Sequence, residues 1–266
     1  MTGGQTCALP IFFFTTDWVD AELLRRKNLL SPHVSPLTEG VPAEFRAADG
    51  AWTGVIARSR NILINTNLVK REDYPASVFD LADPKWKGKV AASTLRDGVP
   101  IWLASLILLK GEAATANWLK GMKANSTALR GNGAVLRAVN AGETEGGVIY
   151  HYYYFQDQAR TGENSKNVGM HFFRNQDPGA FVSVSGGGVL ASSRNQAEAQ
   201  RFLRFIVGKG GQDILKTGDA MEYAVATGAD SHPKLPPINS LDAPKLDPAK
   251  LTSKKVTELM MAAGLL

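Results

Sequence analysis

The chain has 266 residues, of which 44% are hydrophobic and 21% are charged, and its net charge is +5. This composition is typical of a soluble globular protein with one large domain or two lobes. A single cysteine, Cys7, excludes internal disulfides, thiolate zinc sites and iron–sulfur clusters. The basic residues are scattered, so the charge favours anionic ligands and gives no sign of a nucleic-acid partner.

The first eleven residues read as the translation of a sequencing adapter, with Gln-Thr-Cys-Ala-Leu-Pro-Ile at 5–11 as the diagnostic stretch. We hypothesise that residues 1–11 are not native and that the native chain is truncated at its start. The segment has no basic region and no cleavage site, so it is not a signal peptide.

The rest of the chain alternates between short apolar segments and amphipathic segments of helical length. We predict strands at 12–14, 54–57, 61–64, 90–93, 147–150, 170–173 and 182–191. We predict a short helix and a turn within 78–88, and helices at 19–30, 99–110, 113–124, 133–141, 151–160, 195–207, 209–216 and 254–263. This alternation indicates an α/β protein with a largely parallel sheet, whose ligands bind in loops that follow the strands. The longest apolar run, 101–109, is too short to cross a bilayer.

One of these loops carries four tyrosines in five residues, Tyr150-His151-Tyr152-Tyr153-Tyr154, where a strand meets a helix. A free phenol titrates near 10, so a phenolate at neutral pH needs a strongly cationic partner. Hard oxygen donors of this kind suit Fe(III). Neighbours in the first turn of a helix diverge by only about 100°, so two adjacent tyrosines there can hold one ion. The alternative is that these aromatic residues are simply part of the core.

Two further strand-to-helix junctions could contribute to the same site. In the segment 94–98, backbone N–H groups and Arg96 could hold an anion, or the segment could be a capped helix start with a solvated arginine. The segment 130–133 could form a second wall of that pocket or an ordinary turn. The glycine run 186–188 lacks the spacing of a dinucleotide fingerprint and indicates a hinge or a close backbone approach.

The four histidines, His33, His151, His171 and His232, do not have the spacing of metal ligands, and only His151 adjoins the tyrosines. No Ser-His-Asp order, Walker loop or nucleophile elbow can be assembled from the sequence. Nothing in it specifies catalysis.

Six short stretches have an order and spacing that extend over nearly the whole chain from residue 12. They are Trp-Lys-Gly-Lys at 86–89, Asn-Trp-Leu-Lys-Gly at 117–121, Ala-Val-Asn-Ala-Gly-Glu at 138–143, Gln-Asp-Pro-Gly-Ala at 176–180, Val-Ser-Val-Ser-Gly at 182–186 and Ala-Ala-Gly-Leu-Leu at 262–266. With the tyrosine run, they resemble the ferric-iron-binding proteins of bacterial ABC importers, within the family 1 extracellular solute-binding proteins.

The resemblance implies an α/β, two-lobed type II periplasmic binding protein fold with a ligand cleft between the lobes. Lobe 1 would comprise 12–58 and 183–233 and be incomplete because of the truncated start, and lobe 2 would comprise 59–182 and 234–266. The family's adjacent tyrosine ligands match Tyr152 and Tyr153. Its loop for a synergistic anion falls on 94–98, which implies roles for Arg96 and Asp97, and Asn132 matches an asparagine that lines the anion pocket.

The chain departs from the family pattern in two places. Some relatives carry a glutamate ligand after the strand at 12–14, where this chain has Thr15-Thr16-Asp17, so Asp17 is a weak substitute candidate. The first ligand of many relatives lies on an N-terminal strand that this chain does not contain. Tyr154 falls at a position that varies among the relatives, which implies that it supports the metal ligands and does not bind the metal itself.

The implied function is a monomeric receptor, not an enzyme, that binds Fe(III) with carbonate or phosphate and delivers it to an ABC permease in the inner membrane. It would be periplasmic, or lipid-anchored at the outer face of the cytoplasmic membrane. An alternative is a receptor for an anionic or small organic solute such as a phosphonate, sulfate or polyamine, with Arg96 as its main contact and the tyrosines as a stacking wall. An enzyme on the same architecture would need an acid, base or cofactor lysine that the sequence does not offer.

Overall fold

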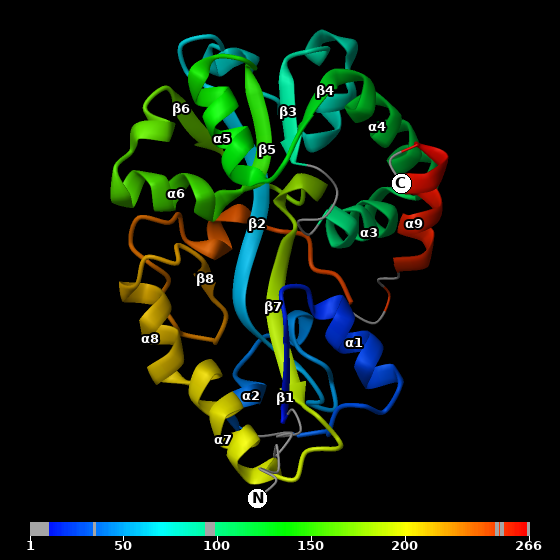
Figure 1. Cartoon of the computed structure of the whole chain (residues 1–266), viewed down its shortest axis with the longest axis vertical. Coiled ribbons are helices and arrows are strands. Elements are labelled where there is room, and N and C mark those ends of the chain that lie inside the picture. Colours follow the sequence, from blue (N-terminus) through cyan, green and yellow to red (C-terminus); the bar gives the residue numbers. More distant parts are fainter. Residues whose placement is uncertain (1–10, 34–35, 94–98, 248–249, 251–252, 265–266) are drawn as a thin grey trace, which may run out of the picture.

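A computed structural model of the chain describes residues 11–33, 36–93, 99–247, 250 and 253–264, which form two lobes joined by long strands (Figure 1). The lower lobe in this view contains β1 (Phe12–Thr15), α1 (Trp18–Arg26), α2 (Pro36–Glu39), α7 (Gln196–Val207), α8 (Lys209–Thr217) and β8 (Tyr223–Ala224). The upper lobe contains β3 (Val90–Ser93), α3 (Val99–Lys110), α4 (Glu112–Asn125), β4 (Ser126–Leu129), α5 (Asn132–Ala141), β5 (Gly146–Tyr150), α6 (His151–Arg160), β6 (Val168–His171) and α9 (Ser253–Ala262).

The strands form one sheet whose order is β1-β7-β2-β5-β3-β4, with β6 and β8 also paired to β2. Only β3 is parallel to its neighbours, β4 and β5, and the other strand pairs are antiparallel. The prediction of a largely parallel sheet was therefore wrong. Strand and helix do alternate through the upper lobe, but β2 and β7 (Val182–Val189) run between the lobes and are antiparallel to each other.

A single 13-residue strand, β2 (Thr53–Asn65), replaces the two predicted strands at 54–57 and 61–64. Its centre is polar, because Arg58, Ser59, Arg60 and Asn61 are consecutive, and all four side chains are buried. A polar run of this kind resembles a turn in the sequence, but here the strand passes from one lobe to the other. β2 crosses between the lobes (Figure 1), and its central residues include two buried arginines, Arg58 and Arg60.

The glycine run in β7 lies where backbones approach closely, as predicted. A Cβ atom at Gly187 would lie 2.1 Å from the carbonyl oxygen of Phe13, and one at Gly188 would lie 2.0 Å from that of Ala51. Real side chains do not tolerate such contacts, so glycine is required for β7 to lie between its neighbours.

Most predicted helices are confirmed within a few residues of their ends. The segment 78–88, predicted as a short helix and a turn, forms two short 3-10 helices, Val78–Ala82 and Pro84–Trp86. Each begins at a capping side chain, Ser77 for the first and Asp83 for the second. The short strand β4 was not predicted, because its four residues carry no alternating pattern.

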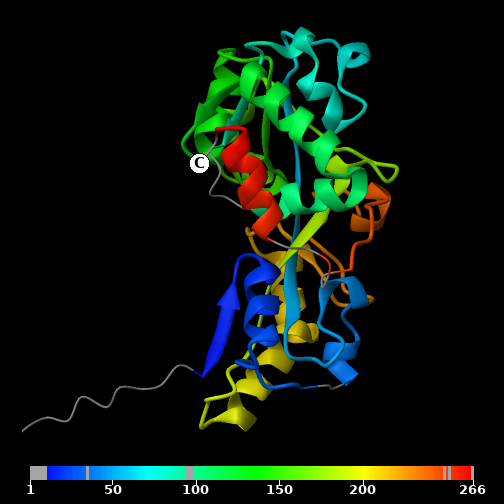
Figure 2. The same ribbon diagram turned by 90° about the vertical axis from the view of Figure 1, so that its right-hand side faces the viewer.

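The C-terminal part of the chain returns from the lower lobe to the upper lobe, where α9 lies against α3 and α4 (Figure 2). Lys123 of α4 secures this end by donating to the carbonyl oxygens of Ala263 and Gly264, at 2.9 and 3.0 Å. The distribution of elements matches two lobes, and the exact crossing points at residues 58, 182 and 233 stay a prediction.

Candidate metal-binding site

The tyrosine pair lies at a strand-to-helix junction, as predicted. β5 ends at Tyr150 and α6 begins at His151, which places Tyr152 and Tyr153 in the first turn of the helix. Their rings stack with centroids 4.6 Å apart, and the ring of Tyr150 stacks on that of Tyr152 at 5.7 Å. Tyr152 and Tyr153 are half-buried, so the pair sits in a protected position without being sealed in the core.

In the absence of a cation, Tyr152 is held in its protonated form. Burial raises the pKa of its phenol, and the neighbouring Tyr153 and the carboxylate of Glu222 raise it further, while Arg58 opposes them. A multivalent cation within bonding distance would reverse the shift, because its charge stabilises the phenolate. The phenol of Tyr152 therefore loses its proton only beside a strongly cationic group.

The neighbours of the pair support its position. The ring of Tyr154 contacts Phe155 edge-on at 5.1 Å and packs against the small core cluster that contains Val135 and Ile149. His151, the first residue of the helix, is fully buried. Burial lowers the pKa of its imidazole to about 4, so the imidazole is neutral at physiological pH.

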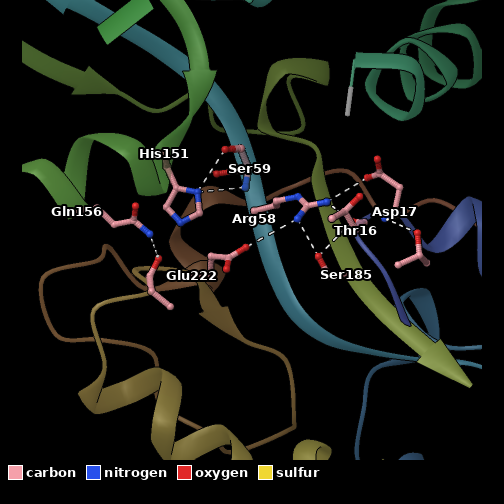
Figure 3. Close-up of polar contacts among 10 residues, drawn as sticks. Thr16, Asp17, Arg58, Ser59, His151, Gln156, Ser185 and Glu222 are labelled. Atoms are coloured by element: carbon pink, nitrogen blue, oxygen red, sulfur yellow. Dashed lines mark hydrogen bonds and ion pairs between the residues drawn. The ribbon is translucent and has the colours of Figure 1, made fainter. Parts of the chain in front are cut away.

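The guanidinium of Arg58 joins segments from distant parts of the chain near the tyrosines (Figure 3). Its Nη1 donates to Ser185 Oγ at 2.7 Å, and its Nη2 donates to Asp17 Oδ1 at 3.2 Å and to the backbone oxygen of Thr16. The carboxylate of Glu222 lies on its other side, with Oε1 at 3.8 Å from Nη1. Asp17, the weak candidate ligand, is thus placed near the site as a partner of Arg58.

Charge and burial compete in this cluster. Although burial lowers the pKa of Arg58, the phenol and carboxylate groups around it raise that pKa above its ordinary value. Burial raises the pKa values of Asp17 and Glu222 despite the nearby guanidinium. The two carboxylates are therefore incompletely compensated, and an added cation would stabilise their charged forms.

Sequence reasoning missed Arg58 and Glu222. The absence of glycine and proline from 55–65 was a signal that β2 is continuous and that Arg58 is buried in it. Glu222 stands alone in an irregular segment, and no local pattern marks it.

On the upper lobe, a set of hydrogen-bond donors lies beside the tyrosines. Asn132 begins α5, and its Oδ1 accepts a hydrogen bond from the backbone N–H of Tyr150 at 3.4 Å. The guanidinium of Arg60 lies 4.3 Å from the ring centroid of Tyr150 and 5.8 Å from that of Trp102. Within the described part of the chain, Asn132 Nδ2, Trp102 Nε1 and the Tyr150 hydroxyl are buried without a hydrogen-bond partner. A buried donor without a hydrogen-bond partner costs free energy, and donors gathered around a cationic side chain favour the binding of an anion.

Two predicted anion contacts, Arg96 and Asp97, lie outside the described residues. The other predicted residues fall into two groups. Tyr152 and Tyr153 lie in the first turn of α6, close to Asn132 at the start of α5. Asp17, just before α1, reaches the same region through its ion pair with Arg58.

The histidines have ordinary structural contacts. His171 Nε2 bonds to the carbonyl oxygen of Pro75 at 2.9 Å, and His33 Nε2 lies 3.2 Å from Arg204. Across the described ranges, no three His, Cys, Asp or Glu side chains are grouped to hold a metal ion. The same ranges contain no helix long and apolar enough to cross a membrane.

The chain is similar in sequence and in structure to known proteins. The chain is 50% identical over 254 residues to the Fe(3+)-binding periplasmic protein of Serratia marcescens, covering 96% of this chain and 75% of that relative. It is 34% identical over 248 residues to the major ferric iron-binding protein of Neisseria meningitidis serogroup B, covering 91% of this chain and 74% of the relative. Iron-bound HitA from Pseudomonas aeruginosa superimposes with a TM-score of 0.88 at 32% identity, over 96% of this chain and 82% of that one.

These similarities confirm the predicted two-lobed periplasmic binding protein fold and the resemblance to ferric-iron-binding proteins. Residues 13–250 match the family described as bacterial extracellular solute-binding protein. The chain belongs to the bacterial extracellular solute-binding protein family.

Proposed function

We propose that this chain is a periplasmic receptor that binds Fe(III) through the phenolate oxygens of Tyr152 and Tyr153 and delivers it to an ABC permease in the inner membrane. The stacked pair in the first turn of α6, with ring centroids 4.6 Å apart, carries the proposal. The names of the Serratia and Neisseria relatives, which describe ferric iron binding, support the same cargo.

Binding exchanges protons for metal. Each phenol gives up its proton to solvent as its oxygen bonds to Fe(III), so two protons leave for each ion bound by the pair. The helix N-terminus stabilises the two phenolates through its partial positive charge. Hard phenolate oxygens favour Fe(III) over the softer Fe(II), so reduction of the ion weakens the site.

A synergistic anion, carbonate or phosphate, fills further coordination positions and offsets part of the metal charge. Asn132 is its described contact, because Nδ2 of this buried side chain has no protein partner among the described residues and the start of α5 adds partial positive charge. Arg96 and Asp97, which precede α3, form the other wall of the anion pocket in this proposal.

Transport then uses the two-lobed architecture. Closure of the lobes excludes water from the bound ion, and opening, protonation of the anion or reduction of iron releases it to the permease. In this proposal the protein acts as a monomer. It is not an enzyme, because no covalent bond in the cargo is made or broken.

The proposal is tested by a visible absorption titration with ferric citrate, with and without added carbonate or phosphate. We expect a coloured phenolate-to-iron charge-transfer band in the wild type that is lost in the double variant Tyr152→Phe with Tyr153→Phe. Tyr154→Phe is the matched control and keeps the band. A well-folded wild type without any band would contradict the proposal and favour a receptor for an anionic solute, held by the donors around Arg60.

A further inference from the structure

Glu222 lies immediately before β8, on the strand edge that faces the tyrosine helix. β8 pairs with β2 in antiparallel register, with Tyr223 opposite Ala57 and Ala224 opposite Ile56. The next pair in this register is Glu222 and Arg58, whose side chains share one face of the sheet. Their ion pair, with Oε1 at 3.8 Å from Nη1, agrees with that register (Figure 3).

Two contacts on either side of Glu222 hold its segment against α6. Gln156 Nε2 donates to the carbonyl oxygen of Ala220 at 2.8 Å, and the imidazole of His151 stacks on the ring of Tyr223 at 4.7 Å. Gln156 is four residues after Tyr152 and so lies on the same face of the helix. The segment 220–223, which contains Glu222, is thereby fixed against the helix that carries Tyr152.

Glu222 is also the less firmly held of the two carboxylates on Arg58. Arg58 Nη2 makes a hydrogen bond of 3.2 Å to Asp17, and Nη1 makes one of 2.7 Å to Ser185, whereas the 3.8 Å contact with Glu222 is an ion pair without a hydrogen bond. The side chain of Glu222 is only 17% exposed. A partly buried carboxylate with no hydrogen bond from the described residues is costly, and a hard cation would relieve that cost.

We infer that Glu222 is a third protein ligand of the ferric ion, contributed from the lower lobe to face Tyr152 and Tyr153 on the upper lobe. Asp17 keeps Arg58 in place, and Glu222 turns from Arg58 to the metal. The ion is then bonded to both lobes, so occupancy of the site favours lobe closure. This inference rests on the proposed function, because it adds a ligand to the same site.

The test compares Glu222→Gln with wild type by ferric titration against competing citrate. Gln keeps the shape of the side chain and removes the anionic oxygen, so we expect affinity for Fe(III) to fall by about 100-fold. We also expect the charge-transfer band to persist at longer wavelength, because iron with one fewer anionic donor is the stronger electron acceptor. Glu222→Asp should recover part of the affinity.

The matched control is Asp219→Asn, which removes an exposed carboxylate of the same loop that pairs with Arg160 at 3.3 Å. It should leave both affinity and band unchanged. A Glu222→Gln protein with wild-type affinity, or with lower affinity and an unmoved band, would overturn the ligand role while leaving the tyrosine site intact. Absence of the band in the wild type would instead overturn the proposed function.

Discussion

The imidazole of His151 stacks on the phenol ring of Tyr223, with centroids 4.7 Å apart and ring planes inclined by 23°. The contact joins the first residue of α6 to the first residue of β8, so it ties the tyrosine helix of the upper lobe to the lower lobe. Nδ1 of the same imidazole lies 3.3 Å from the backbone nitrogen of Ser59 in β2. His151, in α6, therefore contacts two other segments that converge at the site, β8 and β2.

This burial predicts an acid-sensitive fold. The pKa of His151 falls from 6.5 to about 4 on folding, mainly through burial, so the unfolded chain takes up the proton first as pH decreases. The stabilisation is fully present above pH 6.5, is lost progressively as pH falls to about 4, and amounts to about 3 kcal/mol. Urea unfolding of iron-free protein across this range should show a shallower slope for His151→Gln. His232→Gln, which also removes one histidine, should keep the wild-type slope, and equal slopes for the two variants would contradict the account.

Arg58 should be essential to the stability of the lobe junction. Its side chain is 7% exposed and pairs with Asp17 and Glu222, so Arg58→Met leaves two partly buried carboxylates without their cation. We expect a loss of about 3 kcal/mol in urea unfolding of the iron-free protein. Adding Asp17→Asn should restore part of that loss, and strictly additive effects of the two substitutions would show that the pair is not coupled.

Gly187 tests the close approach of β7 to β1. Gly187→Ala places a Cβ 2.1 Å from the carbonyl oxygen of Phe13, so the strands must separate, at a cost of about 3 kcal/mol. Gly169→Ala is the control, because its Cβ would meet only Thr66 Cγ2 at 3.4 Å. Thermal unfolding should show a lower Tm for Gly187→Ala alone, and two equal Tm values would argue against the backbone contact.

Asn132→Asp tests the anion contact. The new carboxylate can still accept the N–H of Tyr150, but it lacks the Nδ2 donor and repels an anion. Iron titrations with and without phosphate should show that phosphate increases the iron affinity of the wild type. The increase should be about tenfold smaller in the variant. An identical effect of phosphate on both proteins would exclude Asn132 from the anion pocket.

The tyrosine junction could be predicted because the residues that form it are consecutive in the sequence. Tyr152 and Tyr153 follow an apolar strand directly, and the helix that begins at His151 sets their directions. The glycine run of β7 was equally local, since three consecutive glycines leave room for a neighbouring backbone wherever the strand is placed.

The role of β2 could not be predicted from neighbouring residues alone. Arg58 and Arg60 are buried in the middle of a strand because distant groups such as Ser185 and the ring of Tyr150 contact them. The place of Glu222 likewise depends on the pairing of β8 with β2. The antiparallel pairing through β2 and β7 is also a tertiary property, because both strands are shared between the lobes.

The central claim is that Tyr152 and Tyr153 bind Fe(III) as phenolates, and resonance Raman spectroscopy of iron-loaded protein, excited in its visible band, tests it most directly. The account predicts ring vibrations of iron-bound tyrosinate in the wild type, weaker in Tyr152→Phe and in Tyr153→Phe, and unchanged in Tyr154→Phe. An iron-loaded wild-type protein whose spectrum contains no tyrosinate vibrations would contradict the claim.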